Sequence, residues 1–186
     1  MRKPIFVAAF ALLLFLFAAA ASPQAPPQVL FEQPILLTSA GQCADVQLAK
    51  VLIKKAGLDS TLVKLATDKD LAGRKTVILV MGASLKGLGA AGLDLDREKE
   101  RVTVLLKAAR EKGIPVFCLH LGGADRRGQT TDEMVAAFLP LAKMAVVVKS
   151  GNSDRFFTKI CRDKNIPLVE VNKTIDAVDP IQKAFK

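Results

Sequence analysis

A short apolar run that opens directly into a glycine-rich stretch constrains the fold of this chain more than any other feature. Residues 76–81 read Thr-Val-Ile-Leu-Val-Met, a segment of strand length that is apolar almost throughout. Residues 82–92 follow with repeated glycines, and a charged helix pattern begins near Asp94. A strand buried on both faces that leads through a flexible loop into a helix is typical of parallel α/β sheets. Such domains bind ligands outside the carboxyl ends of their strands.

The same alternation of strands and helices continues along the chain. We expect strands at residues 35–38, 61–65, 76–81, 115–119, 145–148 and 167–171. Helix patterns separate all of them except the second and third, where residues 67–75 are too few for a crossover helix. In lacking a helix between the second and third strands, the chain resembles flavodoxin-like domains. This resemblance implies the strand order 2-1-3-4-5, with strand 6 beyond strand 5. We therefore expect an α/β fold, a flavodoxin-like or Rossmann-like three-layer sandwich with a mostly parallel sheet.

Capping signals predict where the helices begin. A helix pattern starts near Cys43, and Asp94 offers a capping oxygen to the long helix after the glycine-rich stretch. Thr130 or Thr131 is expected to cap a helix that runs to about residue 142. A last helix is expected over about residues 175–185.

The amino terminus has the features of a secretory signal peptide. Arg2 and Lys3 precede an apolar run that ends in four alanines, and we expect cleavage after Ala21. An uncleaved membrane anchor is the alternative, but the run is short for a span. The pattern predicts a signal peptide over residues 1–21, a proline-rich linker over 22–33 and a single α/β domain over 34–186. The protein is then exported, periplasmic or extracellular, with no membrane contact beyond the signal peptide.

Composition narrows the possible partners and bonds. The chain has a formal net charge of +9, but its basic residues are spread among acids, and it has no Trp or Tyr on which bases could stack. We therefore expect no nucleic-acid partner. Cys43, Cys118 and Cys161 form at most one disulfide, so packing of the core must hold the fold.

Polar and glycine-rich segments follow the predicted strands and should meet at one edge of the sheet. The topological switch point lies between strands one and three, and the helix that begins near Cys43 points its N–H groups toward it. Glycines allow close backbone approach, and lysines and arginines favour an anion, so we expect a small anionic ligand such as a carboxylate or phosphate. Ordinary turn glycines and solvated charges are the alternative interpretation. The candidate ligand-binding residues are Ser39, Gly41, Gln42, Gly82, Ser84, Lys86, Gly87, His120, Gly122, Arg126, Arg127, Ser150 and Asn152.

The glycine-rich stretch does not support a nucleotide cofactor. Residues 87–92 match G-x-G-x-x-G, but the match begins well after the strand end, and no acid follows the next strand. Residues 82–87 lack the G-K-[ST] ending of a phosphate-binding P-loop. Flavodoxins flank FMN with aromatic side chains, whereas this chain has no Tyr or Trp. We predict no cofactor, neither NAD nor FMN.

Two alternatives to a binding domain stay open. Cys43 or Ser84 with His120 would make a hydrolase- or transferase-like enzyme, although no orienting acid is evident and the residues favour a non-catalytic domain. The proline-rich residues 22–33 would suit a protein-interaction module with an unknown partner. One histidine and scattered carboxylates show no metal-ligand spacing, so we predict no metal site.

Four segments, residues 35–42, 82–96, 121–128 and 151–160, together resemble DUF6305, a family of exported bacterial domains. The resemblance extends over nearly the whole chain after the signal peptide. It implies a Rossmann-like domain behind a signal peptide, and it assigns no activity and no catalytic residues.

Overall fold

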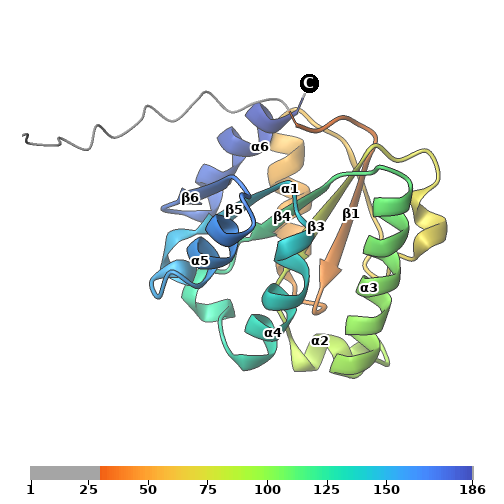
Figure 1. Cartoon of the computed structure of the whole chain (residues 1–186), viewed down its shortest axis with the longest axis horizontal. Coiled ribbons are helices and arrows are strands. Elements are labelled where there is room, and N and C mark those ends of the chain that lie inside the picture. Colours follow the sequence, from red (N-terminus) through yellow and green to blue (C-terminus); the bar gives the residue numbers. More distant parts are fainter. Residues whose placement is uncertain (1–29, 186) are drawn as a thin grey trace, which may run out of the picture.

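Six parallel strands form the central sheet of the computed structural model, which describes residues 30–185 (Figure 1). Their order is β2-β1-β3-β4-β5-β6, which confirms the order expected from the sequence. The predicted signal peptide and most of the predicted linker lie outside the described residues. The strands are β1 (Ile35–Ala40), β2 (Ser60–Leu62), β3 (Thr76–Met81), β4 (Val116–His120), β5 (Met144–Val148) and β6 (Leu168–Val171).

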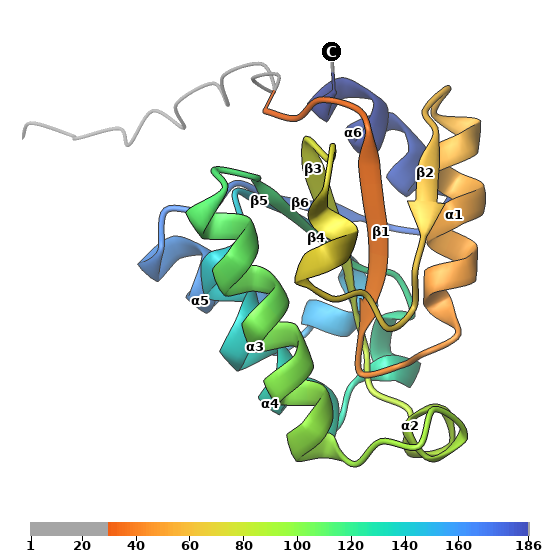
Figure 2. The same ribbon diagram turned by 90° about the vertical axis from the view of Figure 1, so that its right-hand side faces the viewer.

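Helices cover both faces of the sheet. One face carries α1 and α6, and the other carries α3, α4 and α5, as Figure 2 shows with the sheet between the two groups. The helices are α1 (Asp45–Lys55), α2 (Leu85–Ala90), α3 (Leu95–Glu111), α4 (Gln129–Phe138), α5 (Phe156–Asp163) and α6 (Val178–Ala184). Short 3-10 turns lie between them: η1 (Asp68–Leu71), η2 (Gly123–Arg126), η3 (Leu139–Leu141), η4 (Lys149–Asn152) and η5 (Thr174–Ala177).

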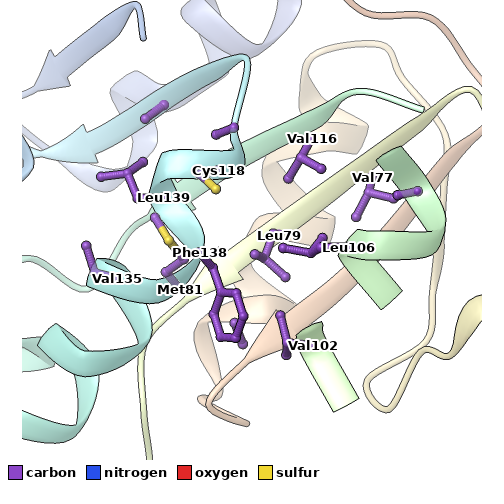
Figure 3. Packing of buried hydrophobic residues seen from close by; sticks show 14 of the residues in the cluster. Val77, Leu79, Met81, Val102, Leu106, Val116, Cys118, Val135, Phe138 and Leu139 are labelled. Atoms are coloured by element: carbon purple, nitrogen blue, oxygen red, sulfur yellow. The ribbon is translucent and has the colours of Figure 1, made fainter. Parts of the chain in front are cut away.

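Two apolar layers, one on each side of the sheet, make the core. Every residue of β1 and β3 is buried, as expected for central parallel strands. On the α3 side Leu79 packs with Val102 and Phe138, which Figure 3 shows in one cluster. The edge strand β2 is short and partly exposed. Within residues 30–185 no helix combines the length and apolar content that crossing a membrane requires.

The structure corrects several predicted element boundaries. α4 starts at Gln129 with Gly128 as its N-cap, so Thr130 and Thr131 lie inside the helix and do not cap it. The predicted glycine loop contains a short helix, α2, with Ser84 as its N-cap. α1 begins at Asp45, two residues after Cys43. These ends depend on local backbone conformation, which the spacing of apolar residues does not specify.

The segment just before β1 also belongs to the core. Phe31 is buried, and its ring stacks on Phe117 with the centroids 4.9 Å apart. The backbone of Phe31 also forms a parallel β-bridge with Phe185, the residue that follows α6. Ordered contacts with the domain therefore begin before Pro34, within the segment that the sequence suggests is a linker.

Candidate functional site

Backbone contacts join the loops that follow β1 and β3. The Ser84 N–H donates to the Gly41 carbonyl oxygen at 2.8 Å, and Gln42 and Ala83 form an antiparallel bridge. Two of the predicted site segments are therefore brought together at the switch point. They contact each other directly, at the lower end of the sheet in Figure 1.

Glycines make this contact possible. Gly41 has a φ of +102°, and a β-carbon there would lie 2.6 Å from the Gly82 carbonyl oxygen. A β-carbon on Gly87 would lie 2.1 Å from the Gln42 carbonyl oxygen. Side chains at these positions would therefore collide with backbone. The close approach that the sequence led us to expect toward a ligand is made here toward the chain's own backbone.

The helix α2 presents exposed side chains beside this junction. Ser84 starts it, and its hydroxyl accepts a hydrogen bond from the Gly87 N–H at 3.1 Å. Leu85 is 74% exposed, and Lys86 is also exposed. Ser84 is therefore a capping residue, whereas Lys86 has no ion pair among the described residues and is available to a ligand.

A buried ion pair on α3 holds the end of β1. Glu98 is completely buried and accepts hydrogen bonds from the Gly41 N–H and the Gln42 side-chain amide, both at 2.9 Å. Arg101 pairs with the same carboxylate at 2.8 Å and donates to the carbonyl oxygens of Ser39 and Ala66. Every charge here has an ionic or hydrogen-bonding partner, as burial requires. The predicted site residues Gly41 and Gln42 are thus fixed from behind by a helix.

The guanidinium of Arg127 is fully used within the protein. Its N–H groups donate to both carboxylate oxygens of Asp132, to both of Asp154, and to the Gly151 carbonyl oxygen. An arginine has five N–H donors, so none is left for a ligand. The guanidinium also lies 5.1 Å from the ring centroid of Phe156. Arg127 therefore fastens the segment before α4 to the loop after β5.

Arg126 faces the start of α1. Its Nε lies 3.3 Å from Oδ1 of Asp45, a residue that is 9% exposed. The other carboxylate oxygen, Oδ2, accepts no hydrogen bond in the described part of the chain. A β-carbon on Gly122 would lie 2.6 Å from that oxygen, so Gly122 leaves room for the carboxylate. The carboxylate of Asp45 thus lies at the amino-terminus of α1, where the sequence led us to expect an anionic ligand.

His120 is buried at the end of β4 and faces the α5 side of the sheet. Its Nδ1 lies 3.0 Å from the Met81 carbonyl oxygen and its Nε2 lies 3.1 Å from that of Gly123. The ring packs against Phe157 with the centroids 4.9 Å apart. Burial lowers the pKa of His120 below its ordinary value, although the two carbonyl oxygens act in the opposite direction. The imidazole is enclosed on both edges by the protein.

Cys43 lies on the opposite side of the sheet from His120. It is 2% exposed and packs in the apolar cluster under α1, with residues such as Val46. Burial, and next the carboxylate of Asp45, raise the pKa of its thiol to about 11. The structure thus does not bring Cys43 and His120 together as a nucleophile and base. Within residues 30–185 no three His, Cys, Asp or Glu side chains cluster in a way that could hold a metal ion.

Ser150 and Asn152, the two candidate site residues after β5, also form hydrogen bonds within the protein. The Asn152 side chain accepts hydrogen bonds from the N–H groups of Phe157 and Thr158 and donates to Glu170, so it orders the start of α5. The Ser150 hydroxyl accepts from the Ala124 N–H at 3.3 Å. Ser150 therefore joins the loops after β4 and β5, whereas Asn152 joins the loop after β5 to α5 and β6.

A small hollow lies at the amino-terminus of α4, and we refer to it as the α4 hollow. Its volume is about 150 Å³, and the residues that line it are Ala83, Leu85, Arg127, Gly128, Gln129, Thr130 and Thr131. No side chain caps the helix. Asp132 N–H makes the first hydrogen bond into the helix, to Gly128, so the three preceding N–H groups have no acceptor among residues 30–185. The Thr131 hydroxyl accepts from the Ala83 N–H at 3.0 Å and connects the helix to the end of β3.

Sequence reasoning did not place Gln129, Thr130 and Thr131 among the candidate ligand-binding residues. Gln129, Thr130 and Thr131 line the hollow, whereas Thr130 and Thr131 were expected only as caps. Gly128 directly before them was the available signal, because a glycine N-cap provides no side-chain oxygen for the helix. The structure brings Arg127 to the hollow but places Cys43, His120 and Asn152 in the protein interior.

The family model for DUF6305, a domain of unknown function, matches residues 32–185. The chain belongs to this family. No curated protein matches this DUF6305 chain.

Comparison with solved structures found matches to this DUF6305 domain at 9%, 12% and 10% sequence identity. Hydroxyethylthiazole kinase from Pyrococcus horikoshii OT3 superposes with a TM-score of 0.52 and 9% identity, over 75% of this chain and 56% of the kinase. A GDSL-like lipase from Bacteroides thetaiotaomicron VPI-5482 gives 0.36 and 12% identity, over 73% of this chain and 66% of the lipase. A GDP-L-fucose synthetase from Naegleria fowleri gives 0.34 and 10% identity, over 80% and 51%. The first comparison shows a common Rossmann-like α/β architecture, and a shared architecture does not carry an activity with it.

Proposed function

We propose that this exported domain is a binding protein for a small anionic compound, a carboxylate or a phosphate, held at the α4 hollow. One observation carries the proposal: the N–H groups of Gln129, Thr130 and Thr131 have no acceptor in the described part of the chain, and these three residues line the hollow. Helix amino-termini with free N–H groups attract anions through hydrogen bonds and the helix dipole.

The residues around the α4 hollow provide a further positive charge for an anion, and the volume of the hollow limits the size of the ligand. Lys86 follows the hollow-lining Leu85 on α2 and is exposed, so its ammonium group is a candidate second contact. Arg127 lines the hollow, but its donors are already occupied, so it would shape the wall and not bind the anion. A volume of about 150 Å³ suits a compact anion better than a nucleotide.

The catalytic alternative has no comparable support. His120 is enclosed by two carbonyl oxygens, Cys43 lies on the other side of the sheet, and Ser84 caps α2. A general base must come within hydrogen-bond reach of the proton that it removes. Export rests on the signal-peptide pattern of residues 1–21, and detection of the mature protein outside the cytoplasm would test it.

The proposal is tested by titrating the chain from residue 22 onward with phosphate, acetate and citrate. Amide resonances of residues 129–131 should shift and saturate in nuclear magnetic resonance spectra. A ligand at 100 times its dissociation constant should also stabilise the fold by about 2.7 kcal/mol. We expect Lys86→Ala to weaken binding.

Two isosteric variants at Thr130 make the test specific. Thr130→Glu places a carboxylate in the first turn, where it stabilises the helix but repels a bound anion, so affinity should fall about tenfold. Thr130→Gln has the same shape without the charge and should bind like the parent. Equal affinity of the two variants, or shifts that avoid residues 129–131, would show that the site is misplaced.

A further inference from the structure

A second and larger cavity lies at the opposite end of the sheet from the α4 hollow, and we refer to it as the amino-edge cavity. It has a volume of about 500 Å³ and lies between α3 and the segments that lead into β4 and β5. Its lining residues are Thr103, Leu106, Lys107, Arg110, Gly113, Ile114, Pro115, Val116, Leu141 and Lys143. Val116 is the first residue of β4, so this cavity is separate from the carboxyl ends of the strands.

The inner surface of the cavity is apolar. Leu106 and Val116, which Figure 3 shows within the α3-side cluster, are buried and continue into the core. Leu141 stands at the cavity with 47% of its surface exposed. A single exposed leucine on a surface is ordinary, but a leucine beside an apolar hollow of this size adds to a continuous apolar wall.

Three cationic side chains accompany this apolar wall. Lys107 and Arg110 are three residues apart on α3 and therefore lie on the same side of the helix, and Lys143 comes from the segment before β5. All three are exposed. None has an ion pair or a side-chain hydrogen bond within residues 30–185, and no Asp or Glu lines the cavity.

We propose that the amino-edge cavity binds an amphiphilic anion, with an aliphatic body against Leu106, Val116 and Leu141 and an anionic head between the three cations. Pockets of about 300–1,000 Å³ with apolar walls and few polar groups are typical of small-molecule sites. The three uncompensated positive charges select an anionic head over a neutral or cationic one. A medium-chain fatty acid combines the required body, head and size.

Burial of the aliphatic body provides affinity, and the cations provide selectivity. Each methylene group transferred from water to the apolar wall should raise affinity about fourfold, so a longer chain should bind more tightly until the cavity is filled. The head stays near the surface, where Lys107, Arg110 and Lys143 are solvated and their attraction weakens with salt.

Calorimetric titration of the chain from residue 22 onward with decanoate tests this site. We expect one decanoate per chain, with amide shifts concentrated in residues 103–116 and 141–143. Butyrate carries the same head but lacks six of the methylene groups, and it should bind on the order of a thousandfold more weakly. Decyltrimethylammonium carries the same body with the opposite charge and should not compete with decanoate.

A matched pair of double variants separates a local site from general attraction to a basic protein. Lys107→Gln with Lys143→Gln should weaken decanoate binding about tenfold. Lys50→Gln with Lys164→Gln removes the same charge from exposed positions elsewhere and should leave binding unchanged. Equal losses in the two double variants would overturn the proposal.

Two further outcomes would also overturn it. Retention of the protein on anionic phosphatidylglycerol vesicles, with no response to free decanoate, would assign the surface to a membrane and not to a single small molecule. Loss of decanoate binding in Thr130→Glu would place the ligand in the α4 hollow. If decanoate binds as expected while the anions tested at the α4 hollow do not bind, the proposal for the amino-edge cavity is supported and the proposal for the α4 hollow is not.

Discussion

Gly87 packs directly against the backbone of Gln42: a β-carbon at position 87 would lie 2.1 Å from the Gln42 carbonyl oxygen. Gly89, two residues on in the same helix, has nothing within 4 Å of the corresponding position. Gly87→Ala should therefore destabilise the protein by about 1–3 kcal/mol through overpacking. Gly89→Ala should stabilise it by up to about 1 kcal/mol, because alanine favours the helix. Thermal unfolding followed by circular dichroism measures both; a Gly87→Ala protein as stable as the parent would show that the two loops separate easily.

The buried pair of Glu98 and Arg101 supports the end of β1 and should be costly to break. Glu98→Gln leaves the Arg101 guanidinium without its counter-charge, and the Arg101 side chain is only 11% exposed. We expect a loss of roughly 3 kcal/mol in the free energy of unfolding. Glu100→Gln, an exposed position on the same helix, should change it by less than about 0.5 kcal/mol. Urea unfolding of the two variants compares them, and similar midpoints would contradict a supporting role for the pair.

The sheet order could be predicted because it depends on features that are local in sequence. Residues 77–81 are all apolar, and the interval from 67 to 75 is too short for a crossover helix. The structure places only the 3-10 turn Asp68–Leu71 there. The length of β2 could not be predicted, because pairing with β1 stops after Leu62 at an edge where few contacts define the strand.

The roles of charged residues could not be predicted, because their partners are distant in sequence. Arg127 looked available to a ligand, but Asp154 reaches it from the loop after β5. Glu98 lies in the first turn of α3, and no spacing in the sequence shows that it is buried there and accepts a hydrogen bond from the Gly41 N–H. Sequence spacing places a cation at the correct edge of the sheet, whereas the fold decides whether its hydrogen bonds are already used.

Replacing Arg127 should change the response of the protein to acid. Hydrogen bonds from Arg127 lower the pKa of Asp154 to about 2. A carboxyl group whose pKa is lower in the folded state stabilises the fold above its unfolded pKa, and this contribution is lost as the pH falls from about 4 to 2. Arg127→Met should therefore lower stability at neutral pH and flatten this acid slope. Unfolding midpoints measured between pH 2 and 6 test the prediction, and an unchanged slope would refute it.

The thiol of Cys43 should react slowly in the folded protein. Its pKa of about 11, raised by burial and by Asp45, reduces the thiolate fraction near pH 7.5 roughly a hundredfold relative to a thiol with the reference value of 9.0. Iodoacetamide labelling followed by peptide mass spectrometry should detect little modification of Cys43 until urea unfolds the chain. The reference is a model cysteine peptide in the same reaction. Labelling of Cys43 as fast as the peptide would revive the nucleophile hypothesis.

His120 should remain neutral at pH values where an ordinary histidine is charged. Its pKa is lowered mainly by burial, so as pH falls the unfolded chain binds a proton before the folded chain does. The free energy of unfolding should therefore decrease as the pH falls below about 6.5. This decrease begins at a higher pH than the one due to Asp154, because the unfolded pKa of histidine is higher than that of aspartate. His120 is the only histidine in the sequence, and its ring protons provide an unambiguous titration curve by nuclear magnetic resonance. A midpoint at or above about 6.5 would mean that the carbonyl oxygens of Met81 and Gly123 outweigh burial and hold an imidazolium.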